Sequence, residues 1–566
     1  MEPVALSPDR RAKDLARMRD ESFDILVIGG GVTGAGIALD AATRGLTVAL
    51  VEQRDFAAGT SSRSSKLIHG GLRYLEQLNF ALVREALTER GLLLNDLAPH
   101  LIKPVSFLYP LKHPVWERAY AGAGVLLYDT LGGARQLPRH QHLSRRKALE
   151  LVPSLRSDAL VGALRYGDAQ VDDARHTMEI ARTAAAYGAA VAISARVTDL
   201  LREGERVVGA VVRDQEGGEE VHVHAKQVIN ATGVWADNIQ EMAGRGRVQV
   251  RASKGIHIVV PKDRIHADSG MILRTETSVL FVVPWGTHWI IGTTDTDWEL
   301  DLAHPAASAT DIQYLLDRVN QVLRTPLTHE DVEGVYAGLR PLLAGESEAT
   351  SKLSREHAVA QTAAGLITIA GGKYTTYRVM AKDAVDAAAR SLPQRVPPCV
   401  TDRTPLLGAE GYHALWNRRR RLADEVGIHV SRIEHLLNRY GSLISELLTL
   451  LEDRPELGER IDGAPDYLKV EALYAASHEG ALHLDDLLTR RTRISVQTFD
   501  RGLAAARDVA PLMGEVLGWD DTTLKREIEH YEARIAAEVE SQKMPDDRTA
   551  DAARMGARDV RVGGAA

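Results

Sequence analysis

The most informative segment of this chain is Phe23-Asp24-Ile25-Leu26-Val27-Ile28-Gly29-Gly30-Gly31-Val32-Thr33-Gly34. Its first half is a short apolar run followed by glycines, which predicts a buried strand. The Ala-rich residues 34–44 predict a helix, and residues 47–51 predict a second strand. Strand, glycine turn, helix and strand fit within about thirty residues, the length of one βαβ unit.

The glycine turn indicates a dinucleotide site. Gly29, Gly31 and Gly34 match the pattern G-x-G-x-x-G between a strand and a helix. Glycine permits the tight turn and lets the backbone approach a pyrophosphate, which the N–H groups of the helix N-terminus can bind. Glu52 ends the second strand, where a carboxylate accepts hydrogen bonds from ribose hydroxyls. The alternative is a glycine-rich turn in some other α/β unit.

The loop after Glu52 favours FAD over NAD. It reads Gly59-Thr60-Ser61-Ser62-Arg63-Ser64-Ser65-Lys66, and its hydroxyls can donate to a diphosphate and to a flavin edge. Composition alone would favour a flexible Ser-rich surface loop. The continuation, however, is Leu67-Ile68-His69-Gly70-Gly71-Leu72-Arg73-Tyr74, which adds an imidazole, a diglycine, a guanidinium and a phenol. A plain linker has no need of that set, so we predict cofactor and substrate contacts here.

Composition limits the class of protein. The 566 residues suit several domains, and 69 basic against 77 acidic residues give a net charge of −8, which does not indicate a nucleic-acid partner. The single cysteine, Cys399, excludes an internal disulfide, a CxxC pair and an iron–sulfur site, and suits a reducing cytoplasm. Residues 1–22 are predicted to be a polar leader without a secretory signal, and no apolar run is long enough to predict a membrane span.

The rest of the chain predicts a β-rich middle and a helical end. Residues 207–212 and 221–224 flank a Gly-Gly pair and predict a hairpin. Short β-rich runs between residues 255 and 292 predict a largely antiparallel sheet, and the apolar spacing over residues 312–323 predicts a helix covering it. Beyond a Pro-rich linker the pattern is helical to about residue 541, and we expect the remainder to be disordered.

Several motifs together carry a resemblance to a known family. In chain order they are the glycine turn, the stretch Ser64–Glu76, Asn230-Ala231-Thr232-Gly233, Gly292-Thr293-Thr294-Asp295, Gly338-Leu339-Arg340-Pro341 and Gly371-Gly372-Lys373-Tyr374-Thr375-Thr376-Tyr377-Arg378. With them the chain resembles the FAD-dependent glycerol-3-phosphate dehydrogenases of the aerobic, quinone-reducing bacterial type. The resemblance is dense from residue 23 to about residue 390 and continues weakly through residues 486–493.

The resemblance implies a fold of α/β plus α+β class, and the strand pattern agrees with it. A Rossmann-like FAD-binding domain would be discontinuous, comprising residues 23–100, 166–250 and 350–392. A substrate-binding domain with an antiparallel sheet would comprise residues 101–165 and 251–349. A linker at 393–405, an all-helical C-terminal domain at 406–541 and a disordered tail at 542–566 would complete the chain.

The resemblance also implies a reaction and partners. Hydride would leave C2 of sn-glycerol 3-phosphate for a non-covalently bound FAD, giving dihydroxyacetone phosphate, and the electrons would pass to a membrane quinone. The enzyme would then lie in the cytoplasm, attached peripherally to the inner face of the cytoplasmic membrane. A homodimer is left open.

The substrate phosphate needs cations, preferably arginine with its fork of donors. We predict that Arg73, Tyr74, Arg340 and Lys373 bind the substrate, although any one arginine taken singly is more often a surface charge. Arg340 and Lys373 are also placed in the catalytic set. The C2 hydroxyl needs a base, for which His69 is the first choice and His257 the second. No metal site is predicted, because the histidine pairs at 140 and 142 and at 222 and 224 have no accompanying ligand motif.

The cofactor-binding residues predicted with this resemblance come from all the glycine-rich and hydroxyl-rich turns. They are Gly29, Gly31, Gly34, Glu52, Thr60, Ser61, Ser62, Lys66, Gly71, Leu72, Val197, Ala231, Thr232, Gly233, Lys373, Thr375 and Thr376.

The strongest charge run, Arg418-Arg419-Arg420-Arg421, has two interpretations. A solvated helix face is the usual one, and contact with anionic lipid is the other.

Three rival functions stay open at this point. They are a flavin oxidase acting on an amine or amino acid, an oxygen-using glycerol-3-phosphate oxidase, and a non-catalytic flavin-bound membrane adaptor.

Overall fold

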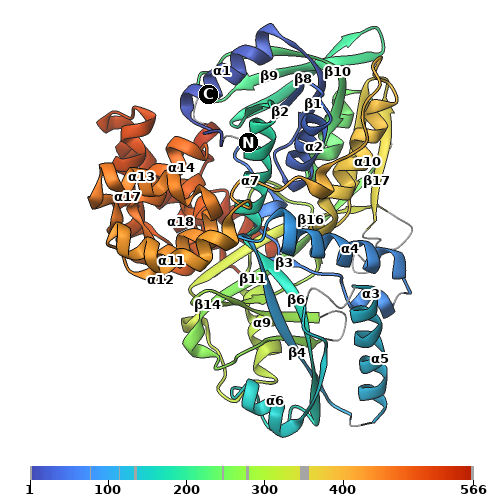
Figure 1. Cartoon of the computed structure of the whole chain (residues 1–566), viewed down its shortest axis with the longest axis vertical. Coiled ribbons are helices and arrows are strands. Elements are labelled where there is room, and N and C mark those ends of the chain that lie inside the picture. Colours follow the sequence, from blue (N-terminus) through green and yellow to red (C-terminus); the bar gives the residue numbers. More distant parts are fainter. Residues whose placement is uncertain are drawn as a thin grey trace.

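The computed structural model describes residues 3–76, 78–113, 115–132, 137–244, 248–275, 279–344 and 356–562, and only the backbone of Arg73, Glu76 and Val562. Two mixed sheets lie end to end along the long axis, and a helical domain packs beside them (Figure 1). This arrangement confirms the predicted fold class.

The first sheet, in the upper half of Figure 1, has a parallel centre. Its parallel strands are, in spatial order, β18 (Leu366–Gly371), β10 (Glu220–Asn230), β1 (Ser22–Ile28), β2 (Val48–Val51) and β7 (Ala190–Ala192). Antiparallel neighbours are β17 (His357–Ala363), β8 (Ala195–Glu203) and β9 (Arg206–Asp214). The antiparallel pairing of β9 with β10 confirms the predicted hairpin.

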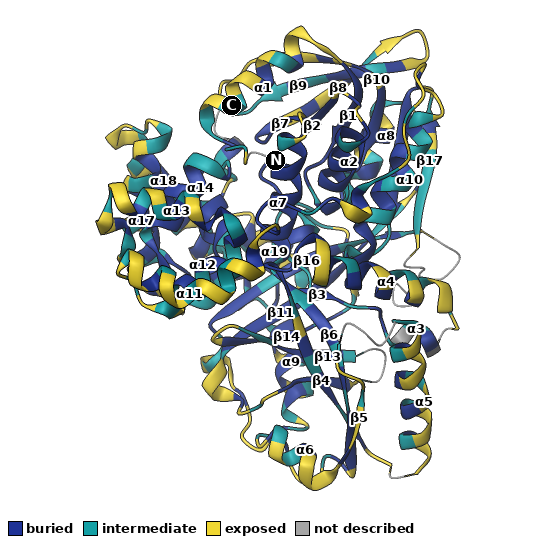
Figure 2. Cartoon of the chain, viewed as in Figure 1, coloured by how far each residue is buried: buried dark blue, intermediate teal, exposed yellow. Residues whose placement is uncertain are grey.

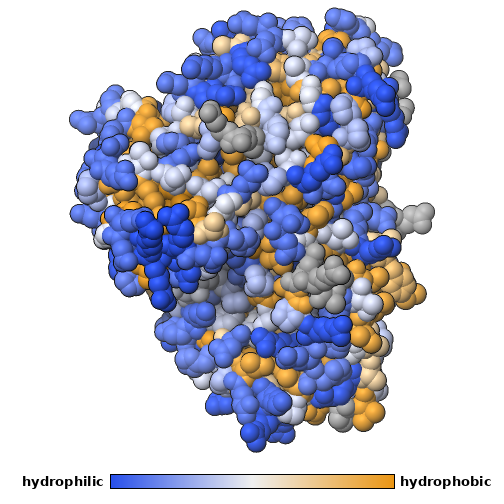
Figure 3. Space-filling model, in the orientation of Figure 1, coloured by the Kyte–Doolittle hydropathy of each residue, from blue (hydrophilic) through white to orange (hydrophobic). Residues whose placement is uncertain are grey.

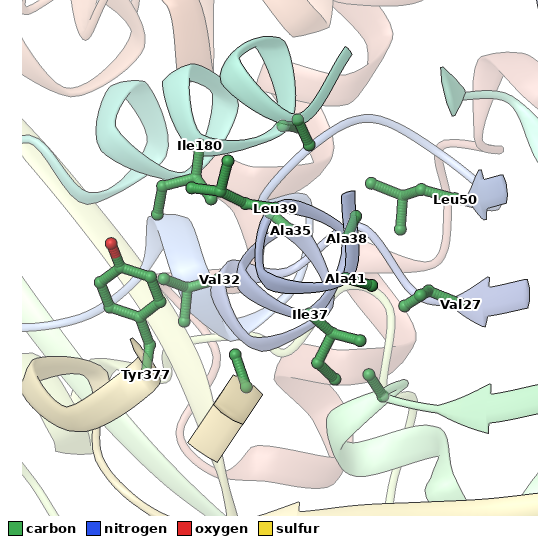
Figure 4. Packing of buried hydrophobic residues seen from close by; sticks show 14 of the residues in the cluster. Val27, Val32, Ala35, Ile37, Ala38, Leu39, Ala41, Leu50, Ile180 and Tyr377 are labelled. Atoms are coloured by element: carbon green, nitrogen blue, oxygen red, sulfur yellow. The ribbon is translucent and has the colours of Figure 1, made fainter. Parts of the chain in front are cut away.

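Helix α2 (Val32–Thr43) is the buried centre of this domain. Figure 4 views it nearly end-on, with Val27 and Leu50 approaching from β1 and β2, Ile180 from α7 (Asp173–Ala186), and Tyr377 from α10 (Tyr377–Ala389). The helix is rich in small residues because its neighbours lie so close: a Cβ at Gly36 would be 2.9 Å from the Tyr377 ring. This packing fixes the direction in which the helix N-terminus points.

The residues predicted to be a polar leader contain helix α1 (Pro8–Asp20) of this first domain. Leu15 and Met18 are buried in the cluster under β7 and β10, and the Asp14 carboxylate accepts the Val191 N–H at 3.1 Å. The outer face of α1 is exposed (Figure 2). Sequence analysis missed this amphipathic helix because most of its residues are charged and only a few apolar ones face the core.

The second sheet, in the lower half of Figure 1, is largely antiparallel, as predicted. Its order is β15 (Thr296–Asp297), β11 (Val250–Pro261), β14 (His288–Gly292), β13 (Val279–Trp285), β12 (Gly270–Arg274), β4 (Ile102–Leu111), β6 (Gly162–Val171) and β3 (Leu67–Ile68). Strand β16 (Gly334–Leu343) pairs with β11, and β5 (Gln141–Ser144) pairs with β6. Helix α9 (Ala309–Asn320) packs Ile312, Leu315 and Leu316 into the core of this sheet, which confirms the covering helix.

The predicted domain boundary between residues 165 and 166 is wrong, because it cuts through β6. That strand pairs with β4 from Ile102–Val171 to Leu111–Gly162 and continues without a break. Strand β6 also pairs with β3, so residues 67 and 68 belong to the second sheet. The Ser-rich loop of the first domain therefore continues directly into a strand of the second sheet.

The C-terminal domain consists mainly of helices with their exposed faces outward (Figure 2). These are α11 (Tyr412–Val426), α12 (Val430–Tyr440), α13 (Ile444–Asp453), α14 (Lys469–His478), α15 (Leu484–Asp486), α16 (Ile494–Gln497), α17 (Leu503–Leu517) and α18 (Asp521–Ser541). A short hairpin of β19 (Arg460–Ile461) and β20 (Ala464–Leu468) interrupts them.

The prediction of a disordered tail is wrong for most of its length. Residues 547–554 form helix α19 (Asp547–Arg554), and a 3-10 turn follows at Val560–Val562. Ala550 is fully buried, and Arg561 is buried in ion pairs with Asp486. The composition resembled that of a disordered segment because the tail is held by charges and small side chains rather than by large apolar ones.

Candidate functional site

A large cavity of about 1550 Å³ lies where the two sheets meet. The turn after β1, residues 58–75, strands β11 and β16, and the turn after β18 all line it. Its volume exceeds the roughly 300–1,000 Å³ of ordinary small-ligand pockets. It therefore has room for a dinucleotide beside a second, smaller molecule.

The glycine turn faces this cavity with the N-terminal end of helix α2. Gly29 has φ +112°, and a Cβ there would lie 2.7 Å from the Ala231 carbonyl oxygen. A Cβ at Gly34 would lie 1.8 Å from the carbonyl oxygen of Gly29. Gly31 lines the cavity, and the Val32 N–H donates to Ser61 Oγ at 2.9 Å. No acidic side chain occupies the first turn of α2, so this end of the helix fits an anion such as a diphosphate.

Glu52 lies at the end of β2 and lines the cavity, as predicted for a ribose-binding acid. Its carboxylate accepts the Gly30 N–H at 2.6 Å and the Arg54 N–H at 2.8 Å. Burial raises the pKa of Glu52, although these two hydrogen bonds act in the opposite direction. The adenosine end of a dinucleotide would therefore lie on this side of the cavity.

Two arginines that sequence reasoning did not single out lie near the same end, Arg54 buried and Arg63 partly buried. Arg54 stacks over Trp235 at 5.5 Å and donates to the Ala303 carbonyl oxygen at 3.1 Å, and Arg63 donates to the same oxygen at 3.3 Å. Burial, together with the surrounding cations, lowers the pKa of Arg63 well below its ordinary value. An anionic cofactor would compensate these charges. Sequence reasoning could have found Arg63, because it lies inside the Ser-rich loop that was already predicted to contact the cofactor.

Four of the predicted cofactor residues do not line the cavity: Gly34, Ser62, Lys66 and Thr376. For Lys66 the structure shows another role. Its Nζ pairs with Asp173 at 2.6 Å and donates to the Ser62 carbonyl oxygen at 2.7 Å. Burial lowers its pKa to about 8, which Asp173 partly opposes. Lys66 thus ties the Ser-rich loop to α7 rather than facing a ligand.

The other predicted cofactor residues all line the cavity. Thr60, which donates to the Leu339 carbonyl oxygen at 2.5 Å, and Ser61 lie in the Ser-rich loop. The remainder come from the turns around it: Gly29, Gly31, Glu52, Gly71, Leu72, Val197, Ala231, Thr232, Gly233, Lys373 and Thr375.

His257 on β11 and Arg340 on β16 lie on neighbouring strands of the second sheet, where Arg340 is opposite Ser253 and Tyr336 is opposite His257. Arg340 Nη2 donates to Thr293 Oγ1 at 3.0 Å and to the Thr294 carbonyl oxygen at 3.2 Å, and Nη1 is 3.5 Å from Asp295. A Cβ at Gly255 would lie 2.4 Å from this guanidinium. Gly255 and His257 are two residues apart on β11, so their side-chain positions share one face of the strand. Both His257 and Arg340 line the cavity.

The ring of His257 is held in place by Tyr336 and Ser65. It stacks on Tyr336 at 4.8 Å with an interplanar angle of 12°, and its Nε2 is 2.8 Å from Ser65 Oγ. Lys66 lies 5.0 Å from the centre of the same Tyr336 ring. Burial and the cations of Arg340 and Lys66 hold the pKa of His257 well below its ordinary value. A neutral imidazole beside a guanidinium can accept a proton from a hydroxyl group.

Lys373, Tyr74 and His69 form a second group on the cavity wall. Lys373 Nζ lies 3.7 Å from the centre of the Tyr74 ring, above Gly71. The backbone of His69 bonds to Thr375 Oγ1 through both its N–H and its carbonyl oxygen, each at 3.2 Å. The His69 ring meets the edge of Phe281 at 6.1 Å. The turn after β18 therefore positions the His-Gly-Gly segment.

Two further predictions concern Arg73 and metals. The side chain of Arg73 lies outside the described residues. Among the residues that are described, no group of three or more His, Cys, Asp or Glu side chains is arranged to hold a metal ion.

Comparison with known proteins agrees with the geometry. The profile of a family described as "FAD dependent oxidoreductase" matches residues 24–378, and that of the "C-terminal domain of alpha-glycerophosphate oxidase" matches residues 399–524. "Glycerol-3-phosphate dehydrogenase 2" of Mycobacterium tuberculosis is 60% identical over 99% of this chain and 96% of its own length. The human "Glycerol-3-phosphate dehydrogenase, mitochondrial" is 38% identical over 93% of this chain and 75% of its own length.

A solved structure extends this likeness to three dimensions. The glycerol-3-phosphate dehydrogenase of Bacillus halodurans, determined in complex with FAD, is 31% identical and superposes with a TM-score of 0.78 over 94% of this chain and 97% of its own. The cavity, its glycine turn and the full-length likeness lead to one conclusion: this chain belongs to the family of FAD-dependent glycerol-3-phosphate dehydrogenases.

Proposed function

We propose that this chain oxidises sn-glycerol 3-phosphate to dihydroxyacetone phosphate with FAD as hydride acceptor and a membrane quinone as final acceptor. The observation that carries the proposal is one cavity with two chemically distinct parts. One part is the N-terminus of α2 beside Glu52 and Ser61. The other holds a histidine, His257, and an arginine, Arg340, on neighbouring strands. The relatives named above act on the same substrate by their names.

Arg340 and Lys373 would hold the substrate phosphate. They come from different strands, β16 and the turn after β18, and both line the cavity. Arg340 also lies next to Asp295, 3.5 Å from its Oδ1, so the guanidinium is positioned by the turn after β14. Charge-assisted hydrogen bonds to phosphate are the strong ones, about 1.5–3 kcal/mol each. Arg73 and Tyr74 complete the proposed substrate set.

For the base we favour His257 over His69, reversing the order that the sequence suggested. His257 shares a strand face with Gly255, over which the Arg340 guanidinium lies. A phosphate held by Arg340 would bring C2 of a three-carbon substrate close to this ring. His69 makes two backbone bonds to Thr375 Oγ1 and an edge contact of its ring with Phe281, and none of these contacts places its ring next to Arg340. Bound FAD would supply the hydride acceptor, and the base would remove the C2 hydroxyl proton as the hydride leaves.

The proposed route to the quinone is an apolar surface that leads into the cavity. Leu78, Phe80, Val115, Trp116, Tyr120, Leu126 and Leu127 are exposed large apolar side chains; we call them the α5 patch. They lie on or beside α3 (Arg73–Glu76), α4 (Phe80–Leu92) and α5 (Trp116–Leu131). Leu78, Phe80, Tyr120 and Leu127 also line the cavity. Figure 3 shows apolar side chains gathered along the edge where these helices lie.

We propose that the α5 patch rests on the inner face of the cytoplasmic membrane. Exposed tryptophan, tyrosine and leucine side chains on one helix are typical of a surface that enters the interface of a bilayer. Among the described residues, no helix combines the length and the apolar character that crossing a bilayer requires.

The four consecutive arginines of α11 support this proposal less well. Arg419 pairs with Glu434 at 2.6 Å and lies over Trp416, and Arg421 pairs with Glu425 at 2.7 Å. Helix α11 is on the other side of the molecule from α5 in Figure 1. A solvated helix face accounts for these residues.

Vesicle binding tests the membrane proposal. A variant carrying Trp116→Ser and Leu126→Ser should lose sedimentation with anionic vesicles, while the control carrying Arg418→Ser and Arg420→Ser should keep most of it. The reverse pattern would move the attachment site to α11. If neither the wild type nor the variants sediment with the vesicles, the proposal of membrane attachment is wrong.

An acceptor assay separates the dehydrogenase from the oxidase. With glycerol 3-phosphate as donor, turnover should be fast with a water-soluble quinone and slow with oxygen alone. Fast peroxide production in air, or turnover of D-amino acids in place of glycerol 3-phosphate, would assign the chain to one of the rival oxidases. A yellow protein that turns over none of these substrates would be the non-catalytic adaptor.

A further inference from the structure

The segment after α18 contacts first the second domain and then the first domain, where it lines the cavity. Residues 543–561, which we call the C-terminal strap, lie beyond both matched family regions, 24–378 and 399–524. At its start the Ala309 N–H donates to the Met544 carbonyl oxygen at 2.8 Å, and Thr310 Oγ1 donates to that of Pro545 at 2.6 Å. The strap is thus fastened to the beginning of α9 in the second domain.

Its helix α19 is anchored by a buried charge and a buried apolar contact. Lys254, fully buried on β11, pairs with Asp547 of the strap and with Asp311 of α9. Ala550 is fully buried in a cluster with Trp298 and Leu339, among others. A buried charge is costly unless it is paired, so the two carboxylates that face Lys254 make this a specific attachment.

The strap then lines the cavity near Glu52. Met555, Ala557, Arg558, Asp559 and Arg561 are all part of the cavity wall. Asp559 lies 3.3 Å from His304 Nε2. Burial disfavours its charged form, but the hydrogen bond from His304 and the charges of Arg561 and Arg54 hold the pKa of Asp559 well below its ordinary value. Asp559 thereby joins the strap electrostatically to Arg54, two residues after Glu52.

Arg561 fastens the end of the strap to two other domains. Its Nη2 binds both carboxylate oxygens of Asp486 in the helical domain, at 2.8 and 2.7 Å. Its Nε donates to Ser194 Oγ of the first domain at 3.2 Å. Asp486 also binds Arg490 at 2.6 Å, which in turn pairs with Asp55. Such a network of buried charges is costly to break, because removal of one member leaves another unpaired.

We propose that the C-terminal strap closes the adenosine end of the FAD cleft and slows the release of the cofactor. The inference rests on FAD binding with Glu52 at the ribose, and it adds a part of the binding site that neither family profile covers. The strap contributes a wall, not a catalytic group. Opening it requires the pairs of Arg561 with Asp486 and of Asp559 with His304 to separate.

Cofactor dissociation measures this role without reference to turnover. We would compare three holoproteins with wild type: a chain ending at residue 542, Arg561→Gln, and Asp559→Asn. Each holoprotein is diluted into buffer, and the release of FAD is followed by the rise in FAD fluorescence as the cofactor leaves the protein. Loss of the Arg561–Asp486 ion pair, or of the buried charge of Asp559 that His304 and Arg561 hold, should accelerate release by roughly ten- to a hundredfold, and the truncated chain should release FAD at least as fast.

The matched control is Arg548→Ala, on the exposed face of the same helix, which should release FAD at the wild-type rate. Should truncation prevent folding, the two point variants decide the matter. Trypsin offers a second readout, since FAD should protect the strap from cleavage at Arg554 and Arg558.

The outcomes separate the two ideas. Yellow protein whose FAD dissociates at the wild-type rate in all three variants would overturn the strap proposal while leaving FAD binding intact. Wild-type protein that never retains FAD would overturn the cofactor assignment itself.

Discussion

At the scale of single residues, the proposed chemistry depends on charges that the structure holds in place. Burial lowers the pKa of His257, the charges of Arg340 and Lys66 lower it further, and both His257 and Lys66 contact the ring of Tyr336. The environment of the proposed base therefore disfavours its charged form. Sequence alone placed Lys66 on the cofactor, because its long-range partner Asp173 on α7 cannot be read from the loop.

The first prediction concerns His257. His257→Asn should slow anaerobic flavin reduction by glycerol 3-phosphate by roughly 10²–10⁴-fold, with little change in the binding of dihydroxyacetone phosphate. His69→Asn should reduce the flavin at close to the wild-type rate. Rapid mixing under anaerobic conditions measures both, and the opposite ranking of the two variants would restore His69 as the base.

The pH profile provides an independent check on the same residue. A lowered pKa keeps the imidazole neutral as pH falls below the ordinary histidine value of about 6.5. Flavin reduction should thus stay constant from pH 8 down to at least pH 6 in wild type. A loss of rate with a midpoint near 6.5 would mean that the base is an ordinary, exposed histidine.

The second prediction concerns Arg340. Arg340→Ala should lower kcat/KM for glycerol 3-phosphate by about ten- to a few-hundredfold, because one charge-assisted contact to phosphate is lost. Turnover of glycerol, which has no phosphate, should change little. Arg340→Lys is the control and should recover part of the loss. Equal losses for both substrates would remove Arg340 from the phosphate site.

At the scale of elements, the helical domain is joined to the first domain by buried ion pairs. His483, before α15, binds Glu216 of the β9–β10 turn at 3.1 Å and Glu527 of α18 at 3.0 Å. Burial and Arg561 lower its pKa, but the two carboxylates prevail and raise it to about 9. The charged imidazole is therefore part of the interface at neutral pH.

The third prediction follows from the sign of that shift. Since the folded pKa lies above the unfolded value, the stabilisation is complete below about pH 6.5 and is lost as pH rises through 9. The thermal midpoint should therefore fall between these pH values, by an amount corresponding to about 1–3 kcal/mol. His483→Gln should flatten this dependence, and the exposed control His413→Gln should leave it unchanged. Identical pH profiles for wild type and His483→Gln would contradict the assignment.

Elements differed in how far the sequence could predict them. The βαβ unit at the glycine turn and the hairpin of β9 and β10 were readable because apolar periodicity and glycine placement are local. Helix α1 and the C-terminal strap were not readable, because they are held by residues far away in the sequence. Arg561 of the strap, for example, pairs with Asp486. The boundary inside β6 was missed because its pairing partner β4 lies about fifty residues earlier.

For the site, the sequence predicted the cavity wall better than the contacts. Thirteen of the seventeen predicted cofactor residues line the cavity, and the four exceptions pack behind it. Arg54 and Arg63 were passed over because a single arginine is usually exposed, whereas burial at the end of β2 and in the Ser-rich loop is a consequence of the assembled domains.

At the scale of the whole molecule, one cavity connects three functions. The first domain and the C-terminal strap line the proposed adenosine end, and β11 and β16 carry the proposed catalytic pair. Part of the exposed apolar α5 patch lines the cavity as well. The two sheets lie end to end (Figure 1), so the cavity at their meeting point is reached by residues from both. The proposed electron path therefore runs from the substrate through FAD to the proposed membrane-facing surface within one continuous cavity.

The most direct test of this account is anaerobic reduction of the bound flavin by glycerol 3-phosphate carrying deuterium at C2. The account predicts that unlabelled substrate bleaches the long-wavelength flavin band in a single phase and that deuterium at C2 slows this phase, because the C2–H bond breaks as hydride moves to FAD. Flavin that stays oxidised with glycerol 3-phosphate, or that is bleached at the same rate by both substrates when chemistry is rate-limiting, would contradict it.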